Sequence, residues 1–265
     1  GGQLYYREFA HFADKAIPGT LKIQPPYVVY HVLAQCAPVA EAADLLKNKV
    51  TIMNLPLFGS VPTLHWAFSD RTGEMIVVEP DRDGLKVYRN TIGVMTNSPG
   101  YSWHRLNLLN YAGIRDLDYD VLDLESDRLN QCFSGSGAQG LPGDWSSPSR
   151  FIRLAFLKKY CVKGRDESQG VANMLHLFQS AAFPLGIVRI TEQGTVTEYD
   201  KDISPYDYTV YTSIMCGESL RFYWTTYQNQ QIQCVDMNHL KKGMKAVQFD
   251  LEQPPNLHLL SCPEK

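Results

Sequence analysis

The chain has 265 residues, of which 44% are hydrophobic and 20% are charged, and its formal net charge is −3 at pH 7. This mild negative charge disfavours binding to nucleic acid or to anionic membranes, and no apolar run reaches the ~20 residues that a bilayer span needs. The six cysteines include no C-x-x-C pair, which argues against a zinc site and a disulfide framework. We therefore expect small apolar fillers in a reducing, cytoplasmic compartment, with no bound metal.

The predicted elements run in the order helix, sheet, helices, sheet. Apolar spacing predicts a helix over 26–48, with Val28, Val32 and Leu33 on one face. Short β-rich runs separated by turn signals follow at 63–68, 75–79, 85–88 and 93–96. Helical spacing returns over 103–111, 147–162 and 167–183, and strands are predicted at 207–216, 219–227 and 231–237. An antiparallel meander followed by helices and further hairpins indicates the α+β class.

A glycine-rich segment matches the dinucleotide fingerprint G-x-G-x-x-G at Gly135–Gly140. The fingerprint needs a helix that opens at its end, and Pro142 and Gly143 would break such a helix. A flexible loop with exposed backbone is the better interpretation. The seven histidines never fall at metal-ligand spacing, so we expect structural or solvated roles for them.

Asn97 ends the predicted strand 93–96 and is followed by Ser98, Pro99 and Gly100. A side-chain amide at a strand end, fixed by a turn, is well placed to donate a hydrogen bond into a pocket. The alternative is an Asx turn, in which the amide bonds to its own backbone.

Arg150 lies in the first turn of the predicted helix 147–162. A cation at that position opposes the helix dipole, and a residue that departs from the local rule is a candidate for function. The alternative is an ordinary solvated or ion-paired arginine.

Several co-linear segments follow one another in an order found in a known family. They are Thr63–Trp66, Ile92–Pro99, Asn107–Tyr111, Gly140–Asp144, Ser146–Phe151 and Tyr211–Ser213. Together they resemble the choloylglycine hydrolases, a family that contains conjugated bile salt hydrolases and penicillin V acylases, and the likeness runs from about Pro56 to Met237. The resemblance implies an α+β, N-terminal nucleophile hydrolase fold of αββα layers, with two stacked antiparallel sheets.

The resemblance also implies a mechanism without a cofactor. An N-terminal cysteine, with its own α-amine as base, attacks a linear amide, and preorganised donors stabilise the oxyanion. Carried over to this sequence, Asn97 becomes an oxyanion donor and Arg150 the cation that favours the thiolate. The family's nucleophile would precede Gly1. We therefore expect residues 1–265 to form one domain without its N-terminal segment and without hydrolase activity of its own.

The family resemblance assigns substrate contacts less sharply. Leu57, Phe58 and Leu64 could form an apolar wall for a steroid or acyl group, with core packing as the alternative. Phe133 begins a loop, 133–141, that matches a mobile active-site loop of the family. The expected partner is a small molecule, a conjugated bile salt, with self-association into a tetramer as a looser expectation. Penicillin V acylase or other N-acyl amidase activity is one alternative, and a catalytically inactive binding module is another.

Overall fold

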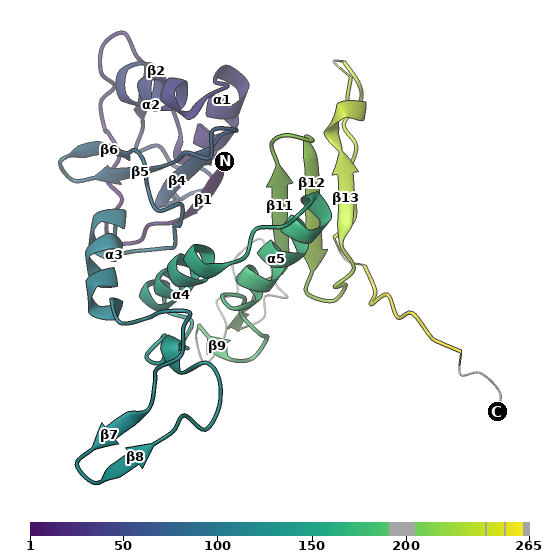
Figure 1. Ribbon diagram of the computed structural model, residues 1–265. Helices are drawn as coiled ribbons and strands as arrows, with labels where there is room; N and C mark the ends of the chain where they lie inside the picture. The colour runs from purple at the N-terminus through teal and green to yellow at the C-terminus, as the bar shows by residue number, and fades with distance from the viewer. Residues whose placement is uncertain (191–204, 242, 252, 262–265) are drawn as a thin grey trace. The chain divides into compact units, whose positions relative to one another are not determined.

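The computed structural model describes residues 1–190, 205–241, 243–251 and 253–261 (Figure 1). The chain divides into two compact units, Gly1–Tyr160 and Cys161–Lys265. No helix in the described parts of the chain combines the length and the apolar character that a bilayer crossing requires.

The first unit is built on a four-stranded antiparallel sheet in the order β1–β4–β5–β6 (Figure 1). The strands are Gly2–Tyr5, Leu64–Ser69, Met75–Asp81 and Gly84–Tyr88. The meander β4–β5–β6 confirms the predicted strands at 63–68, 75–79 and 85–88.

The predicted strand at 93–96 is wrong, because these residues form no strand and β1 instead pairs with β4. Gly93 has a φ of 76°, which turns the backbone away from extended geometry. Just before it, the Ile92 N–H donates to the Tyr101 hydroxyl at 2.9 Å rather than to a neighbouring strand.

The predicted helix 26–48 is a 3₁₀ turn and two helices: η1 Pro25–Tyr27, α1 Val28–Gln35 and α2 Val39–Asn48. The break falls before Pro38, because a residue that precedes proline is pushed out of the helical region. The first N–H of α2, on Val39, donates to the Asp70 carboxylate at 2.8 Å. Beside these helices, β2 Leu21–Ile23 and β3 Val50–Ile52 form a short parallel pair.

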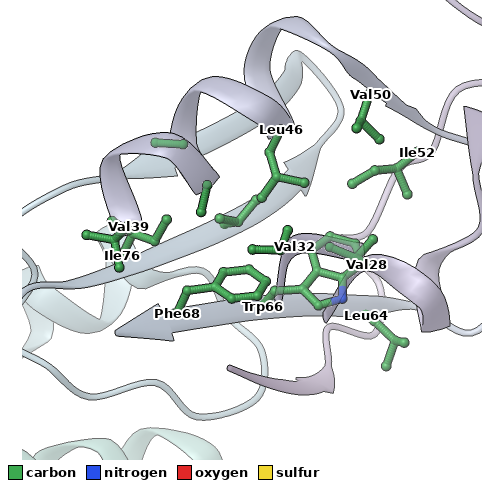
Figure 2. Close-up of a cluster of buried hydrophobic side chains, with 13 residues drawn as sticks. Val28, Val32, Val39, Leu46, Val50, Ile52, Leu64, Trp66, Phe68 and Ile76 are labelled. Carbon is green, nitrogen blue, oxygen red and sulfur yellow. The ribbon is translucent and has the colours of Figure 1, made fainter. Parts of the chain in front are cut away.

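One face of the sheet is apolar and is covered by α1 and α2. Alternate residues of a strand point to the same face, so Leu64, Trp66 and Phe68 of β4 lie on one side. They pack against Val32 and Leu46 from the helices (Figure 2). Burial of each such side chain contributes about 1.5–3 kcal/mol. Leu33, which the sequence placed on the buried face, is 59% exposed because it lies one position round the helix from Val32.

The opposite face of the sheet carries Val77 of β5, which packs with Val94, Tyr101 and Phe151. These contacts bring together α3 Tyr101–Asn107, which continues into η2 Leu108–Tyr111, and α4 Ser147–Tyr160. The predicted helices at 103–111 and 147–162 are thus confirmed. Between them lie the hairpin β7 Leu122–Leu124 and β8 Asp127–Leu129, and the turn η3 Ser136–Ala138.

The second unit combines α5 Glu167–Gln179 with an antiparallel sheet, β11–β12–β13. The strands are Tyr211–Cys216, Arg221–Thr226 and Gln233–Asp236, which confirms the predicted hairpins. The Glu167 carboxylate holds α5 on this sheet by accepting from the Ser219 and Tyr223 hydroxyls at 2.6 and 2.7 Å. The unit also contains the pair β9 Val188–Arg189 and β10 Tyr206–Asp207, and the turn η4 Met237–His239.

Five cysteines in the described parts of the chain are free thiols. Cys132 and Cys234 are exposed, so the expectation of buried apolar fillers is wrong for these two. Cys262 lies outside the described residues.

Candidate active site

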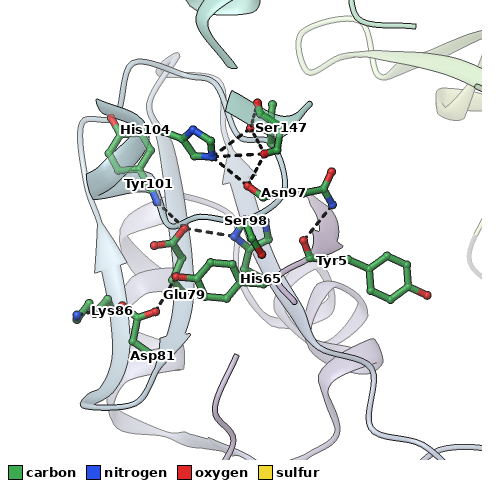
Figure 3. A network of polar contacts seen from close by, with 12 residues as sticks. Tyr5, His65, Glu79, Asp81, Lys86, Asn97, Ser98, Tyr101, His104 and Ser147 are labelled. Carbon is green, nitrogen blue, oxygen red and sulfur yellow. Dashed lines mark hydrogen bonds and ion pairs between the residues drawn. The ribbon is translucent and has the colours of Figure 1, made fainter. Parts of the chain in front are cut away.

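The side chain of Asn97 bridges two segments that are far apart in the sequence. Its Nδ2 donates to the main-chain carbonyl of Tyr5 at 2.9 Å (Figure 3). Its Oδ1 accepts from the Arg150 guanidinium, also at 2.9 Å. An Asx turn would instead bond the amide to its own backbone. The structure therefore brings together the two residues, Asn97 and Arg150, that the sequence singled out for catalysis.

The amide of Asn97 has an unambiguous orientation. A guanidinium group only donates hydrogen bonds and a main-chain carbonyl only accepts them. The atom that faces Arg150 must therefore be the oxygen, and the atom that faces Tyr5 must be the nitrogen. An amide nitrogen has two hydrogens, so the bond to Tyr5 leaves the second hydrogen of Asn97 for a further acceptor.

The main-chain carbonyl of Asn97 is held as well. It accepts from the Ser147 hydroxyl at 2.7 Å and from His104 Nε2 at 3.0 Å (Figure 3). The preceding residue, Thr96, donates its hydroxyl to the Ser147 carbonyl at 3.1 Å. Side chains from the first turns of α3 and α4 thus fix a segment that belongs to no helix or strand.

His104 is only 2% exposed and stacks on Phe151, with ring centroids 4.5 Å apart and planes 12° apart. Burial lowers the pKa of His104, so the imidazole is neutral at neutral pH. Because the carbonyl of Asn97 can only accept, Nε2 must carry the single ring hydrogen.

The start of α4 is stabilised by Asp144. Its carboxylate accepts from the Ser146 N–H at 2.9 Å and from the Ser149 hydroxyl at 2.6 Å. Donation by the Ser146 and Ser149 hydroxyls and by the Ser146 N–H lowers the pKa of Asp144 to about 2. This negative charge before the helix offsets the unfavourable effect of the Arg150 cation in the first turn. Arg150 also donates from Nε to the Trp145 carbonyl at 3.0 Å.

A second polar cluster fixes the start of α3 (Figure 3). Oε1 of Glu79, a residue 1% exposed, accepts from the Tyr101 N–H at 2.8 Å and contacts His65 Nδ1 at 3.3 Å. Gly100 lies against this cluster. A Cβ on Gly100 would lie 2.7 Å from the Tyr6 hydroxyl and 2.9 Å from Glu79 Oε2, so no larger residue fits without a shift.

Burial and a 2.7 Å bond to Asp81 raise the pKa of the Tyr6 hydroxyl well above its usual range. Asp81 in turn pairs with Lys86 at 3.0 Å. Tyr6 stacks on His65 with ring centroids 4.6 Å apart. These contacts join the end of β1 to β4 and β5, which carry His65 and Glu79.

The glycine-rich loop is organised around a carboxylate of the same chain. Oδ1 of Asp118 accepts from the Gly135 N–H at 2.7 Å, the Ser136 hydroxyl at 3.2 Å and the Gly137 N–H at 3.4 Å. These donors lower the pKa of Asp118, with the Gly135 N–H as the largest cause. The backbone groups that would cradle a phosphate in a dinucleotide site therefore bind Asp118.

The predicted substrate contacts lie in different environments. Leu64 is 6% exposed and belongs to the core cluster on β4, so core packing is the role that the structure displays for it. Phe58, at 80% exposure, and Leu57 lie in the tight turn Leu57–Ser60. Phe133, at 87% exposure, lies in the loop after β8. Their substrate roles stay predictions.

Sequence reasoning missed three residues that contact Asn97: Tyr5, His104 and Ser147. Tyr5 and Ser147 lie 92 and 50 residues from Asn97 in the sequence, and no local sequence pattern predicts contacts over such separations. His104 lies only seven residues from Asn97, and its place in the first turn after the Asn97–Gly100 segment was the one available signal.

Comparison with known proteins places this geometry in a family. Residues 1–248 match the family described as linear amide C–N hydrolases, choloylglycine hydrolase family. The chain is 36% identical over 237 residues to a bile salt hydrolase/transferase of Clostridium perfringens, covering 89% of this chain and 68% of the relative. It is 32% identical over 235 residues to a protein of the same description from Lactiplantibacillus plantarum, covering 87% of this chain and 68% of the relative.

Solved structures agree with the family match. A mutant conjugated bile acid hydrolase from Clostridium perfringens superposes with a TM-score of 0.85 at 33% identity, covering 98% of this chain and 76% of that one. Penicillin V acylase from Agrobacterium tumefaciens superposes with a TM-score of 0.64 at 19% identity, covering 90% of this chain and 63% of that one, which shows the fold alone. These likenesses confirm the predicted α+β, N-terminal nucleophile hydrolase fold. The chain belongs to the choloylglycine hydrolase family of linear amide C–N hydrolases.

Proposed function

We propose that this protein hydrolyses the amide bond that joins a bile acid to glycine or taurine. The observation that carries the proposal is the 2.9 Å contact between Asn97 Oδ1 and the Arg150 guanidinium, which joins an amide donor and a fixed cation in one site. The similarity to bile salt hydrolase/transferases from Clostridium perfringens and Lactiplantibacillus plantarum supports this substrate class.

In the proposed reaction, Asn97 stabilises the oxyanion of the tetrahedral intermediate. Arg150 and Tyr5 hold the amide by its oxygen and by one of its hydrogens, so the second hydrogen points in a direction set before the substrate binds. A donor that is already oriented costs no reorganisation when negative charge develops, which is how oxyanion sites accelerate acyl transfer.

The proposed nucleophile is an N-terminal cysteine thiolate outside these 265 residues. In this type of catalysis the free α-amine of the cysteine acts as the base for its own thiol. A positive charge close to a thiol favours the thiolate, and this is the role we propose for Arg150. We further propose that the 265 residues alone do not hydrolyse amides.

We also propose that the two compact units form one functional domain. The family match over residues 1–248 supports this, because it crosses the boundary between Tyr160 and Cys161. We also propose that the protein is cytoplasmic and forms a homotetramer. Light scattering of the purified protein measures its oligomeric state.

The test compares the 265-residue protein with a form that includes any coding sequence upstream of Gly1. Both are incubated with glycocholate, taurocholate and penicillin V, and the released glycine, taurine or 6-aminopenicillanic acid is quantified by mass spectrometry. We expect the longer form to release glycine or taurine and the shorter form to release nothing. Release of 6-aminopenicillanic acid alone would assign a penicillin V acylase. Tight binding of bile salts without hydrolysis by either form would assign a binding module.

Variants of the active form test the two site residues. Asn97→Ala is expected to lower kcat by about 10²–10³-fold, as loss of one oxyanion donor does. Asn48→Ala is the matched control, because Asn48 is exposed and bonds to Asp44 at the end of α2. Arg150→Ala is expected to move alkylation of the nucleophilic thiol to higher pH. An unaltered alkylation profile would leave Arg150 with a structural role only.

A further inference from the structure

The main-chain carbonyl of Asn97 is fixed from two helices at once. The Ser147 hydroxyl of α4 lies 2.7 Å away, and His104 Nε2 of α3 lies 3.0 Å away. Asn97 itself belongs to no helix or strand, so its backbone has no regular hydrogen-bond ladder to hold it. Fixing the carbonyl fixes the peptide plane that contains the Asn97 Cα, and so anchors the point from which the side chain leaves the backbone.

We propose that His104 and Ser147 are positioning residues for the Asn97 amide, a role that rests on the function proposed above. Neither residue contacts the substrate in this proposal, and both act through Asn97. The proposal extends the site from two residues to a frame in which the backbone and the side chain of Asn97 are held separately.

The geometry of α4 makes Ser147 suited to this role. Ser147 and Arg150 are three residues apart on one helix, so they lie on the same face. Ser147 holds the carbonyl of Asn97, and Arg150 holds its side-chain oxygen. A single turn of α4 therefore holds both the main-chain carbonyl and the side-chain oxygen of Asn97.

The surroundings of His104 make it a rigid donor. The ring is 2% exposed and is stacked on Phe151, which itself is 1% exposed. Its helix begins at Tyr101, whose N–H donates to the buried Glu79. Because the His104 ring is already held in place, it loses little conformational entropy when it bonds to the Asn97 carbonyl. The ring therefore orients the carbonyl, and not the reverse.

The test uses variants that remove or keep the donor. Ser147→Ala and His104→Leu remove it, whereas Ser147→Thr keeps a hydroxyl and His104→Gln keeps an N–H at a similar distance from the backbone. The matched control is Ser149→Ala. Ser149 lies in the same turn of α4 and is buried, but its hydroxyl bonds to Asp144 rather than to Asn97.

The first readout does not depend on activity. The side-chain NH₂ signals of Asn97 are followed by ¹⁵N NMR and identified by their absence in Asn97→Ala. We expect these signals to shift and broaden in Ser147→Ala and His104→Leu, and to stay near their original positions in Ser147→Thr, His104→Gln and Ser149→Ala. Unchanged signals in both donor-free variants would overturn the proposal.

The second readout is kinetic. In the form that hydrolyses the amide, we expect the donor-free variants to lower kcat about tenfold with KM unchanged, the scale of one lost hydrogen bond. A rise in KM with unchanged kcat would also overturn the proposal. If no form is active, the proposed function fails while the NMR result still decides the positioning role. If His104→Leu does not fold, the pair Ser147→Ala and Ser147→Thr decides it alone.

Discussion

Glu79 is the residue whose replacement tests the buried polar cluster most directly. It is 1% exposed, and a single oxygen, Oε1, accepts from the Tyr101 N–H at 2.8 Å and contacts His65 Nδ1 at 3.3 Å. Its second oxygen, Oε2, has no hydrogen-bond partner among the described residues. The two oxygens therefore contribute unequally, and two substitutions can separate them.

Glu79→Ala leaves the Tyr101 and His65 donors buried and unpaired, at a cost of about 1–3 kcal/mol each. With the cavity added, we expect a loss of about 3–5 kcal/mol in the free energy of unfolding, similar to breaking a buried pair. Glu79→Gln keeps an oxygen in the place of Oε1 and puts an NH₂ group in the place of Oε2. That NH₂ group lies where Oε2 has no hydrogen-bond partner among the described residues, so we expect a loss of only about 1–2 kcal/mol.

Urea unfolding followed by circular dichroism measures both losses, and hydrogen exchange of the peptides 75–81 and 101–107 locates them. Protection is expected to fall first in 101–107, because Glu79 holds the first N–H of α3. Equal losses for Glu79→Ala and Glu79→Gln would refute the reasoning, since they would mean that Oε1 is not the centre of the cluster.

Three further predictions concern stability. Gly100→Ala is expected to cost about 1–3 kcal/mol because its Cβ would crowd the Tyr6 hydroxyl, whereas Gly113→Ala, whose nearest such contact is at 3.8 Å, is the neutral control in the same thermal melts. Asp166→Ala removes the cap that accepts from the Gln169 N–H at 2.9 Å, so exchange should quicken in the first turn of α5 at a cost of about 1 kcal/mol. Burial lowers the pKa of His104 in the folded protein, so at mildly acidic pH the unfolded chain binds more protons than the folded one. The free energy of unfolding should therefore fall as pH drops below about 6.5, the usual pKa of histidine. His104→Gln should remove that part of the slope in urea titrations at pH 7 and pH 5.5, and an unchanged slope would contradict the assignment.

Periodic patterns predicted the elements that depend on local sequence. The helices α4 and α5 and the meander β4–β5–β6 were found because their apolar spacing is regular over several residues. The strand β1 was missed because Gly2–Tyr5 forms a strand by pairing with β4, about 60 residues away in the sequence. Residues 93–96 have β-rich composition, yet the φ of 76° at Gly93 ends the extended geometry before a ladder can form.

The site was predictable only in part. Family likeness selected Asn97 and Arg150, and local sequence offered an alternative for each. Their contact joins residues 53 positions apart, and the bonds from Tyr5 and Ser147 span similar or greater separations. Such contacts depend on how α3 and α4 pack on the sheet through Tyr101 and Phe151, which no single segment encodes.

Because Ser147 and Arg150 share one helical turn, any sliding of α4 along its axis would carry the Asn97 carbonyl and the guanidinium together. Their mutual spacing would survive such a slide, while the position of the Asn97 amide relative to the rest of the site would change. Substitutions on the buried face of α4, at Phe151 or Ile152, should therefore lower the proposed amidase activity gradually rather than abolish it. Under the proposed function, packing changes on that face would then appear as a graded loss of turnover.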